Sequence, residues 1–181
     1  MAPAGAATKK MRLTSTQIGL LAENLVINAL LIVSGGRLVP FRPVADDYGI
    51  DLLLYDKTTG RALPLQVKAR TKTLKRSGCE ERGDVVHFEV REVALRNKGV
   101  TRLLGVLLNE EMTTITAAWL MPLPDVERIG SKRNQKLVIR PSRAENSHDK
   151  FRAYFLPSIQ SLVTKLLTEF EQLDRTFAAV G

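Results

Sequence analysis

Cysteine, histidine and tryptophan are almost absent from this chain of 181 residues, which has one cysteine, two histidines and one tryptophan. Cys79 has no partner for an internal disulfide, and a cysteine-rich zinc site is excluded. His87 and His148 lack the spacing of a metal-ligand motif. Trp119 lies in an apolar segment, so we expect it in the core. So little cysteine fits a reducing environment, and we expect a cytoplasmic protein.

Long hydrophobic runs are also missing. The longest, residues 25–33, is interrupted by Asn28 and falls short of the roughly eighteen residues that a membrane span requires. The N-terminal stretch MAPAGAATKK lacks the apolar region of a signal peptide. We expect no membrane association and a disordered basic tail over residues 1–12. A single domain should follow over residues 13–181, with a core (15–121) and a C-terminal extension (122–181).

Basic residues outnumber acidic ones. The chain has 27 Lys and Arg against 19 Asp and Glu, a formal net charge of +8 and a pI near 9.9. This balance favours a polyanionic partner such as a nucleic acid, although charge alone indicates neither fold nor chemistry. With 44% hydrophobic and 25% charged residues, the composition is otherwise that of an ordinary globular protein.

The order of elements predicts an α/β protein with a mixed central sheet flanked by helices. A helix over 14–36 has marked ends, because Thr14 and Gln17 form a capping box and a glycine pair stops it. Polar loops are expected at 71–84 and 141–150, and residues 122–136 are rich in proline and charge. Strands are expected at 37–41, 50–55, 61–70, 85–90, 101–109, 114–121 and 136–140, and helices at 91–99 and from about Pro157 onward.

Polar residues mark the ends of two of these strands. Asp51 begins one strand, and Gln66, Val67 and Lys68 end its partner after the turn DKTTG. In an antiparallel pair the start of one strand lies beside the end of the other. Asp51, Gln66 and Lys68 should therefore converge within about 5 Å, while Val67 points into the core. A carboxylate, an amide oxygen and a backbone carbonyl are hard ligands suited to Mg²⁺. Lys68 adds a charge that can orient water or stabilise a phosphorane.

These residues carry a resemblance to a known family. Glu23 on the first helix, then GID from Gly49, a turn and QVKAR from Gln66 resemble the PD-(D/E)xK nuclease superfamily, especially its Mrr-type and Holliday-junction-resolvase-like members. The resemblance covers about residues 15–110 and implies a restriction-endonuclease-like α-β-β-β-α-β core. It implies that Asp51 binds Mg²⁺ (or Mn²⁺ in its place), that Gln66 is the second ligand position and that Lys68 is catalytic. Glu23 would complete or support the metal site.

The sequence departs from the family pattern at two positions. Ile50 stands where the pattern has proline, and Gln66 stands where it has Asp or Glu. Mrr-type relatives share this Gln, but a neutral amide binds Mg²⁺ more weakly than a carboxylate. Two hypotheses stay open, a metal-dependent DNA endonuclease and an inactive nuclease-fold module that binds nucleic acid or a protein. Either can act as a homodimer or within a restriction, recombination or defence assembly. Asp51 and Lys68 can also be a mere surface ion pair.

Two basic clusters offer contacts to phosphate groups. The first continues from the strand that carries Lys68 and is expected to grip phosphates beside the metal; it comprises Arg70, Lys72, Lys75 and Arg76. The second is as consistent with a solvated loop as with a DNA-binding arm; it comprises Lys132, Arg133, Lys136, Arg140 and Arg143. Asp46 and Asp47 are expected to form a turn, with a supplementary ligand role left open.

Overall fold

The computed structural model of the chain describes residues 13–45, 49–92, 95 and 99–178. A six-stranded sheet forms its centre, in the order β1-β2-β3-β5-β6-β9. All neighbours run antiparallel except β3 and β5, which are parallel, so the sheet is mixed. The strands are β1 (Leu38–Phe41), β2 (Leu52–Asp56), β3 (Arg61–Arg70), β5 (Arg102–Leu108), β6 (Ile115–Pro122) and β9 (Phe155–Leu156).

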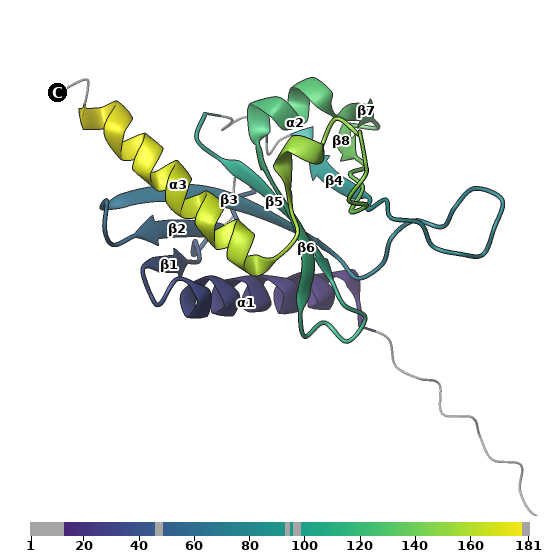
Figure 1. The fold of residues 1–181 in the computed structure, drawn as a ribbon, viewed down its shortest axis with the longest axis horizontal. Helices are drawn as coiled ribbons and strands as arrows, with labels where there is room; N and C mark the ends of the chain where they lie inside the picture. The colour runs from purple at the N-terminus through teal and green to yellow at the C-terminus, as the bar shows by residue number, and fades with distance from the viewer. Residues whose placement is uncertain (1–12, 46–48, 93–94, 96–98, 179–181) are drawn as a thin grey trace, which may run out of the picture.

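Two long helices cover one face of the large sheet (Figure 1). They are α1 (Ser15–Val33) and α3 (Ile159–Ala178). The expected capping box of α1 is confirmed, because Thr14 Oγ1 accepts from Gln17 N at 3.2 Å and Gln17 Oε1 accepts from Thr14 N at 2.8 Å. Gly35 and Gly36 follow the helix with φ of 61° and 77°, a conformation that favours glycine and ends the helix.

A second, smaller sheet packs on the opposite face of the large one. Its order is β4-β8-β7, with β4 (Phe88–Arg91), β8 (Lys136–Ile139) and β7 (Ser131–Arg133) all antiparallel. Together with α2 (Leu123–Ile129) it encloses a second hydrophobic core around Trp119, which is fully buried as expected. The molecule therefore has three layers, with a hydrophobic core on each side of the large sheet.

The predicted fold class is confirmed, and the structure adds detail to several local expectations. Within the proline- and charge-rich residues 122–136, for which the sequence predicts no element, the structure forms α2 and β7. The last helix begins at Ile159, close to Pro157 as expected, and Ser158 Oγ accepts from Ser161 N at 3.1 Å at its start. The strand expected at 85–90 begins at Phe88. Most of the helix expected at 91–99, the tail 1–12, and Asp46 and Asp47 lie outside the described residues.

Helix α1 is the element that bears on the expectation about membrane-spanning segments, which stays a prediction. By length and composition it can cross a membrane, because few charges interrupt its apolar residues. In this fold it is also a core helix, since Ala22, Val26 and Leu30 are fully buried against the sheet. Its outer side leaves Leu20 and Ile32 exposed. Both faces of α1 are therefore rich in apolar side chains.

Candidate functional site

The β2–β3 hairpin places Asp51 beside the residues that the sequence pairs with it. Leu52 lies opposite Leu65, and Asp51 N donates to Leu65 O at 3.0 Å, so Asp51 comes opposite Gln66. The Asp51 carboxylate then reaches across the hairpin, where its Oδ2 accepts from Val67 N at 2.6 Å. Oδ2 also lies 3.8 Å from the Lys68 ammonium. The predicted approach of Asp51 to Lys68 is therefore present, and the strand register places Gln66 opposite Asp51.

Alternation along β3 sends its polar and apolar side chains to opposite faces. Val67 is buried in the core under α1 and α3. Gln66 pairs with Leu103 of β5, and Leu103 belongs to the core under the small sheet. Gln66 and Lys68 therefore lie on the small-sheet side. Among the described residues, no residue of β1, β2 or β3 belongs to the core under the small sheet. The site therefore lies at the edge of the area that the small sheet covers.

Gln66 supplies the observation that tests a metal here. Its side chain is only 3% exposed, and its Oε1 accepts no hydrogen bond within the described part of the chain. A buried carbonyl oxygen without a donor is costly, and a cation is a partner that satisfies it. Among the described residues no three His, Cys, Asp or Glu side chains gather as a metal cluster. A metal would thus rely on Asp51, the Gln66 amide, the Val67 carbonyl and water, which fit a hard cation.

Glu23 occupies a separate position on α1. Its carboxylate lies 3.7 Å from the Arg42 guanidinium, which also donates to Asn24 Oδ1 at 2.7 Å. Arg42 follows β1 and precedes the segment that leads to Asp51, so this contact ties α1 to the approach of the site. The close approach of Glu23 to Asp51 stays a prediction.

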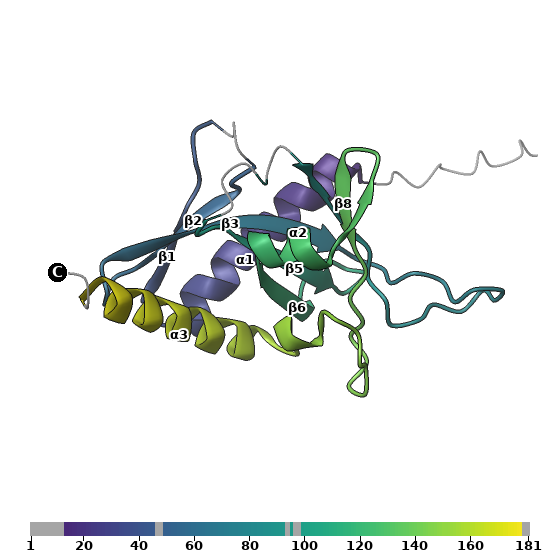
Figure 2. The same ribbon diagram turned by 90° about the horizontal axis from the view of Figure 1, so that it is seen from above.

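The segment 71–87 joins β3 to β4 and begins three residues after Lys68. Its middle part projects from the body as a narrow arm (Figures 1 and 2), whereas Val86 near its end is buried in the core under the small sheet. The segment is not the plain loop expected, because its two sides pair through Lys75 and Arg82 and through hydrogen bonds such as Leu74 N to Val85 O at 2.7 Å. Glycine at 78 lies near the tip with φ of 77°. An arm that leaves the site directly is well placed to contact a bound polymer.

Acids within reach neutralise part of the basic run. Lys72 lies 3.8 Å from Glu110, Arg76 lies 3.7 Å from Glu81, and Lys75 pairs with Glu80. Arg70 is half-buried and donates to the preceding carbonyl at 2.9 Å. The sequence interpretation overlooked Arg82, which returns along the arm and donates to Thr73 O. Its spacing from Lys75 in the sequence gives no sign of this pairing.

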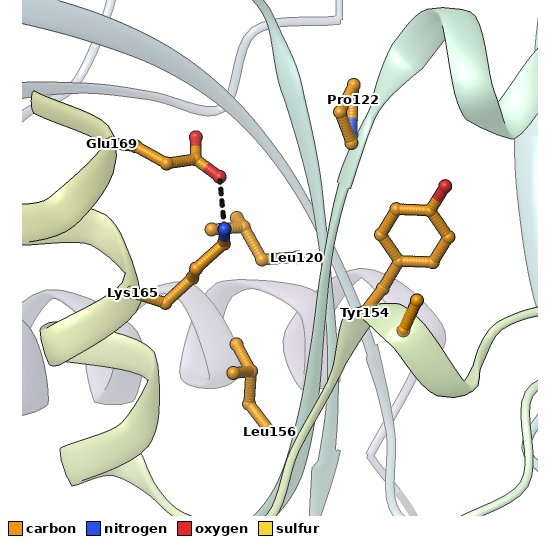
Figure 3. A pocket seen from close by; sticks show the side chains of 7 residues that line it. Leu120, Pro122, Tyr154, Leu156, Lys165 and Glu169 are labelled. Carbon is orange, nitrogen blue, oxygen red and sulfur yellow. Dashed lines mark ion pairs between the residues drawn. The ribbon is translucent and has the colours of Figure 1, made fainter. Parts of the chain in front are cut away.

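A pocket of about 250 Å³ lies elsewhere, between α3 and the β6–β9 end of the large sheet (Figure 3). The carboxylate of Glu169 is buried there and is 3.8 Å from Lys165 and 2.9 Å from Arg102. Two cations thus compensate one acid. Such a satisfied ion-pair group fixes α3 on the sheet and needs no ligand.

Comparisons with known proteins bear on the arrangement as a whole. No protein-family model matches the sequence, and no curated protein matches it. Among solved structures the chain is similar to a bacterial homing endonuclease, I-Ssp6803I, with a TM-score of 0.59 and 16% sequence identity. The similarity covers 91% of this chain and 99% of that one. The fold is nuclease-like. At this level of identity the similarity shows the fold alone, and the roles of single residues stay predictions.

Proposed function

We propose that the chain is a metal-dependent DNA endonuclease of the PD-(D/E)xK type, which hydrolyses phosphodiester bonds at Asp51, Gln66 and Lys68. The observation that carries the proposal is the convergence of an acid, a buried amide oxygen without a donor and a lysine on one face of the sheet. The nuclease-like fold and the net charge of +8 support it. We further propose that the protein works in the cytoplasm.

Each side chain has a separate task in this hydrolysis. Asp51, Gln66 and the Val67 carbonyl would hold Mg²⁺ or Mn²⁺. Glu23 would add a second negative charge to the metal site. The bound cation would supply Lewis-acid charge to the phosphodiester. Asp51 is held in place by Val67 N–H, so its carboxylate is oriented before substrate arrives. Lys68 places a positive charge where negative charge grows on the phosphoryl oxygens, as water adds to phosphorus and the ester oxygen leaves.

The direct test is to incubate the purified protein with labelled duplex, flap, junction and single-stranded DNA in Mg²⁺, Mn²⁺ or EDTA. We expect cleavage of at least one structure with a metal and none in EDTA. Asp51→Ala should abolish it, because the metal loses its carboxylate. Lys57→Ala is the matched control, since Lys57 is exposed in the turn between β2 and β3. Cleavage by the Asp51 variant at the wild-type rate would reject the proposal.

A binding module without cleavage is the second candidate. Gln66 in place of an acid, and the lack of a three-acid cluster in the described part of the chain, favour it. This candidate predicts that wild type cuts none of the DNA structures in any metal. It also predicts that Asp51→Ala binds DNA as tightly as wild type does.

A further inference from the structure

The outer face of the small sheet carries a row of like charges. Lys136 on β8 lies opposite Arg91 on β4 and also opposite Arg133 on β7. Directly opposite residues share a face and lie about 5 Å apart. Three cations therefore stand side by side, an arrangement that lowers the stability of a sheet. All three side chains are exposed.

Acids compensate only part of this charge. The Glu89 carboxylate lies 2.6 Å from the Lys136 ammonium and 3.2 Å from His87. Arg140, at the other end of β8, donates to His87 Nδ1 at 3.4 Å. Within the described ranges no carboxylate pairs with Arg91, Arg133 or Arg140. Glu89 is thus the one acid beside the four cations Arg91, Arg133, Lys136 and Arg140. On the arm, by contrast, acids pair with Lys72, Lys75 and Arg76.

A pocket of about 350 Å³ opens on the same side of the hairpin. Cations and apolar side chains line it with a single acid, and its lining includes Arg133, Arg140, Lys150, Val138, Phe151 and Asp149. The oxygens of that acid accept hydrogen bonds from Ser142 N and Phe151 N, both at 2.7 Å. Asp149 therefore holds its own loop together, and the pocket wall stays predominantly basic.

We propose that this outer face, formed by Arg91, Arg133, Lys136 and Arg140, is a second nucleic-acid-binding surface that holds the phosphate backbone of duplex DNA. A polyanion removes the repulsion within the row, and a two-stranded ribbon such as β7–β8 fits a major groove about 12 Å wide. Leu137 and Ile139 of β8 point into the core, so the outer face is turned away from the large sheet. The phosphates held here are distinct from those at Asp51, and their binding does not depend on cleavage.

The test measures DNA affinity against salt concentration in EDTA, so that cleavage plays no part. Arg133→Ala/Arg140→Ala should bind a duplex about tenfold more weakly and lower the log–log salt slope by about two, one unit for each lost phosphate contact. The matched control is Lys57→Ala/Arg175→Ala. It removes the same charge from exposed positions at the far end of the molecule, the β2–β3 turn and the end of α3 (Figure 1). Arg133→Lys/Arg140→Lys should restore most of the slope.

Three results would overturn the proposal. They are failure of wild type to bind DNA, equal losses in the patch and control variants, and a patch variant that loses binding only to anionic phospholipid vesicles. Misfolding is checked by thermal unfolding, where removal of repulsion should leave the patch variant at least as stable as wild type. Absence of cleavage would reject the proposed function but not this binding surface. An unchanged salt slope in the patch variant would reject the binding surface but not the proposed function.

Discussion

At the scale of single residues, Gln66 decides between an enzyme and a binding module. Its buried oxygen without a donor costs about 1–3 kcal/mol unless a cation satisfies it. The sequence predicts that Gln66 meets Asp51 and Lys68, because a short turn fixes the hairpin register. It cannot predict that this oxygen is buried without a donor, because burial depends on how the layers pack around β3. It also cannot predict how close Glu23 comes, because that depends on how α1 packs.

Gln66→Glu tests this position without relying on activity. A second buried carboxylate should lower the melting temperature of the metal-free variant, because Lys68 on the same face is already paired with Asp51. Mn²⁺ should restore it and bind about tenfold more tightly than to wild type. Gln172→Glu on the exposed side of α3 makes the same charge change and should alter neither quantity. Equal Mn²⁺ affinity in wild type and Gln66→Glu would remove Gln66 from the metal site.

Asp56 offers a pH-dependent test of the β1–β2 packing. Burial alone raises the pKa of Asp56, but hydrogen bonds from Arg37, Thr58 and Thr59 outweigh it and hold the pKa below its ordinary value of 3.8. The stability this carboxylate gives is present above the unfolded pKa and is lost as the pH falls through the folded pKa. Arg37→Leu should therefore cost about 2 kcal/mol at pH 7 and much less once the pH falls below the folded pKa of Asp56.

The control for this variant is Arg61→Leu. It breaks a partly exposed pair with Asp174 at 3.3 Å and should cost less than about 1 kcal/mol. Urea unfolding of both variants at several pH values measures the difference. A loss that is independent of pH in Arg37→Leu would show that packing of the arginine stem, rather than its charge, stabilises the hairpin.

At the scale of elements, the strong local patterns were predictable and the weak ones were not. The capping residues and the apolar stripe of α1 predict a helix from neighbouring residues alone, and the apolar runs of β5 and β6 predict strands in the same way. Helix α2 is only seven residues long with prolines at its start, and β7 is three exposed residues, so the local pattern of each is weak. They form because α2 and β8 pack on the core around Trp119, a contact between distant segments.

Helix α1 should behave as a core element of the folded protein. Leu30→Ala is expected to lower the free energy of unfolding by about 3 kcal/mol, because its side chain is fully buried. Ile32→Ala, in the same helix and 78% exposed, should change it by less than about 0.5 kcal/mol. Denaturant unfolding of the two variants makes the comparison. Equal small losses would mean that α1 does not pack on the sheet.

The arm gives opposite predictions for the two members of one ion pair. If Lys75 contacts phosphate, Lys75→Ala should weaken duplex binding and lower the salt slope by about one unit. Glu80→Ala frees Lys75 and should tighten binding. Gel-shift titrations at two salt concentrations distinguish the effects. No change in either variant would leave the arm as a solvated hairpin.

At the scale of the whole molecule, the three layers determine where substrate can lie. The helices close one face of the large sheet, and the small sheet covers β5 and β6 on the other. The β1–β3 half of that face carries Asp51, Gln66 and Lys68, with the arm at its end. The sequence predicts the order of the first strands and the C-terminal helix. It does not predict the small sheet, because β4 pairs with β8 across more than forty residues.

The central claim is that Asp51 and Lys68 serve one metal-dependent hydrolytic reaction in different ways. The most direct measurement is single-turnover DNA cleavage beside Mn²⁺ binding in wild type, Asp51→Ala and Lys68→Ala. We predict that Asp51→Ala loses both cleavage and Mn²⁺ binding. Lys68→Ala should keep Mn²⁺ binding while its cleavage rate falls by about 10²-fold or more. A wild-type cleavage rate in Lys68→Ala, or cleavage that survives Asp51→Ala, would contradict the account.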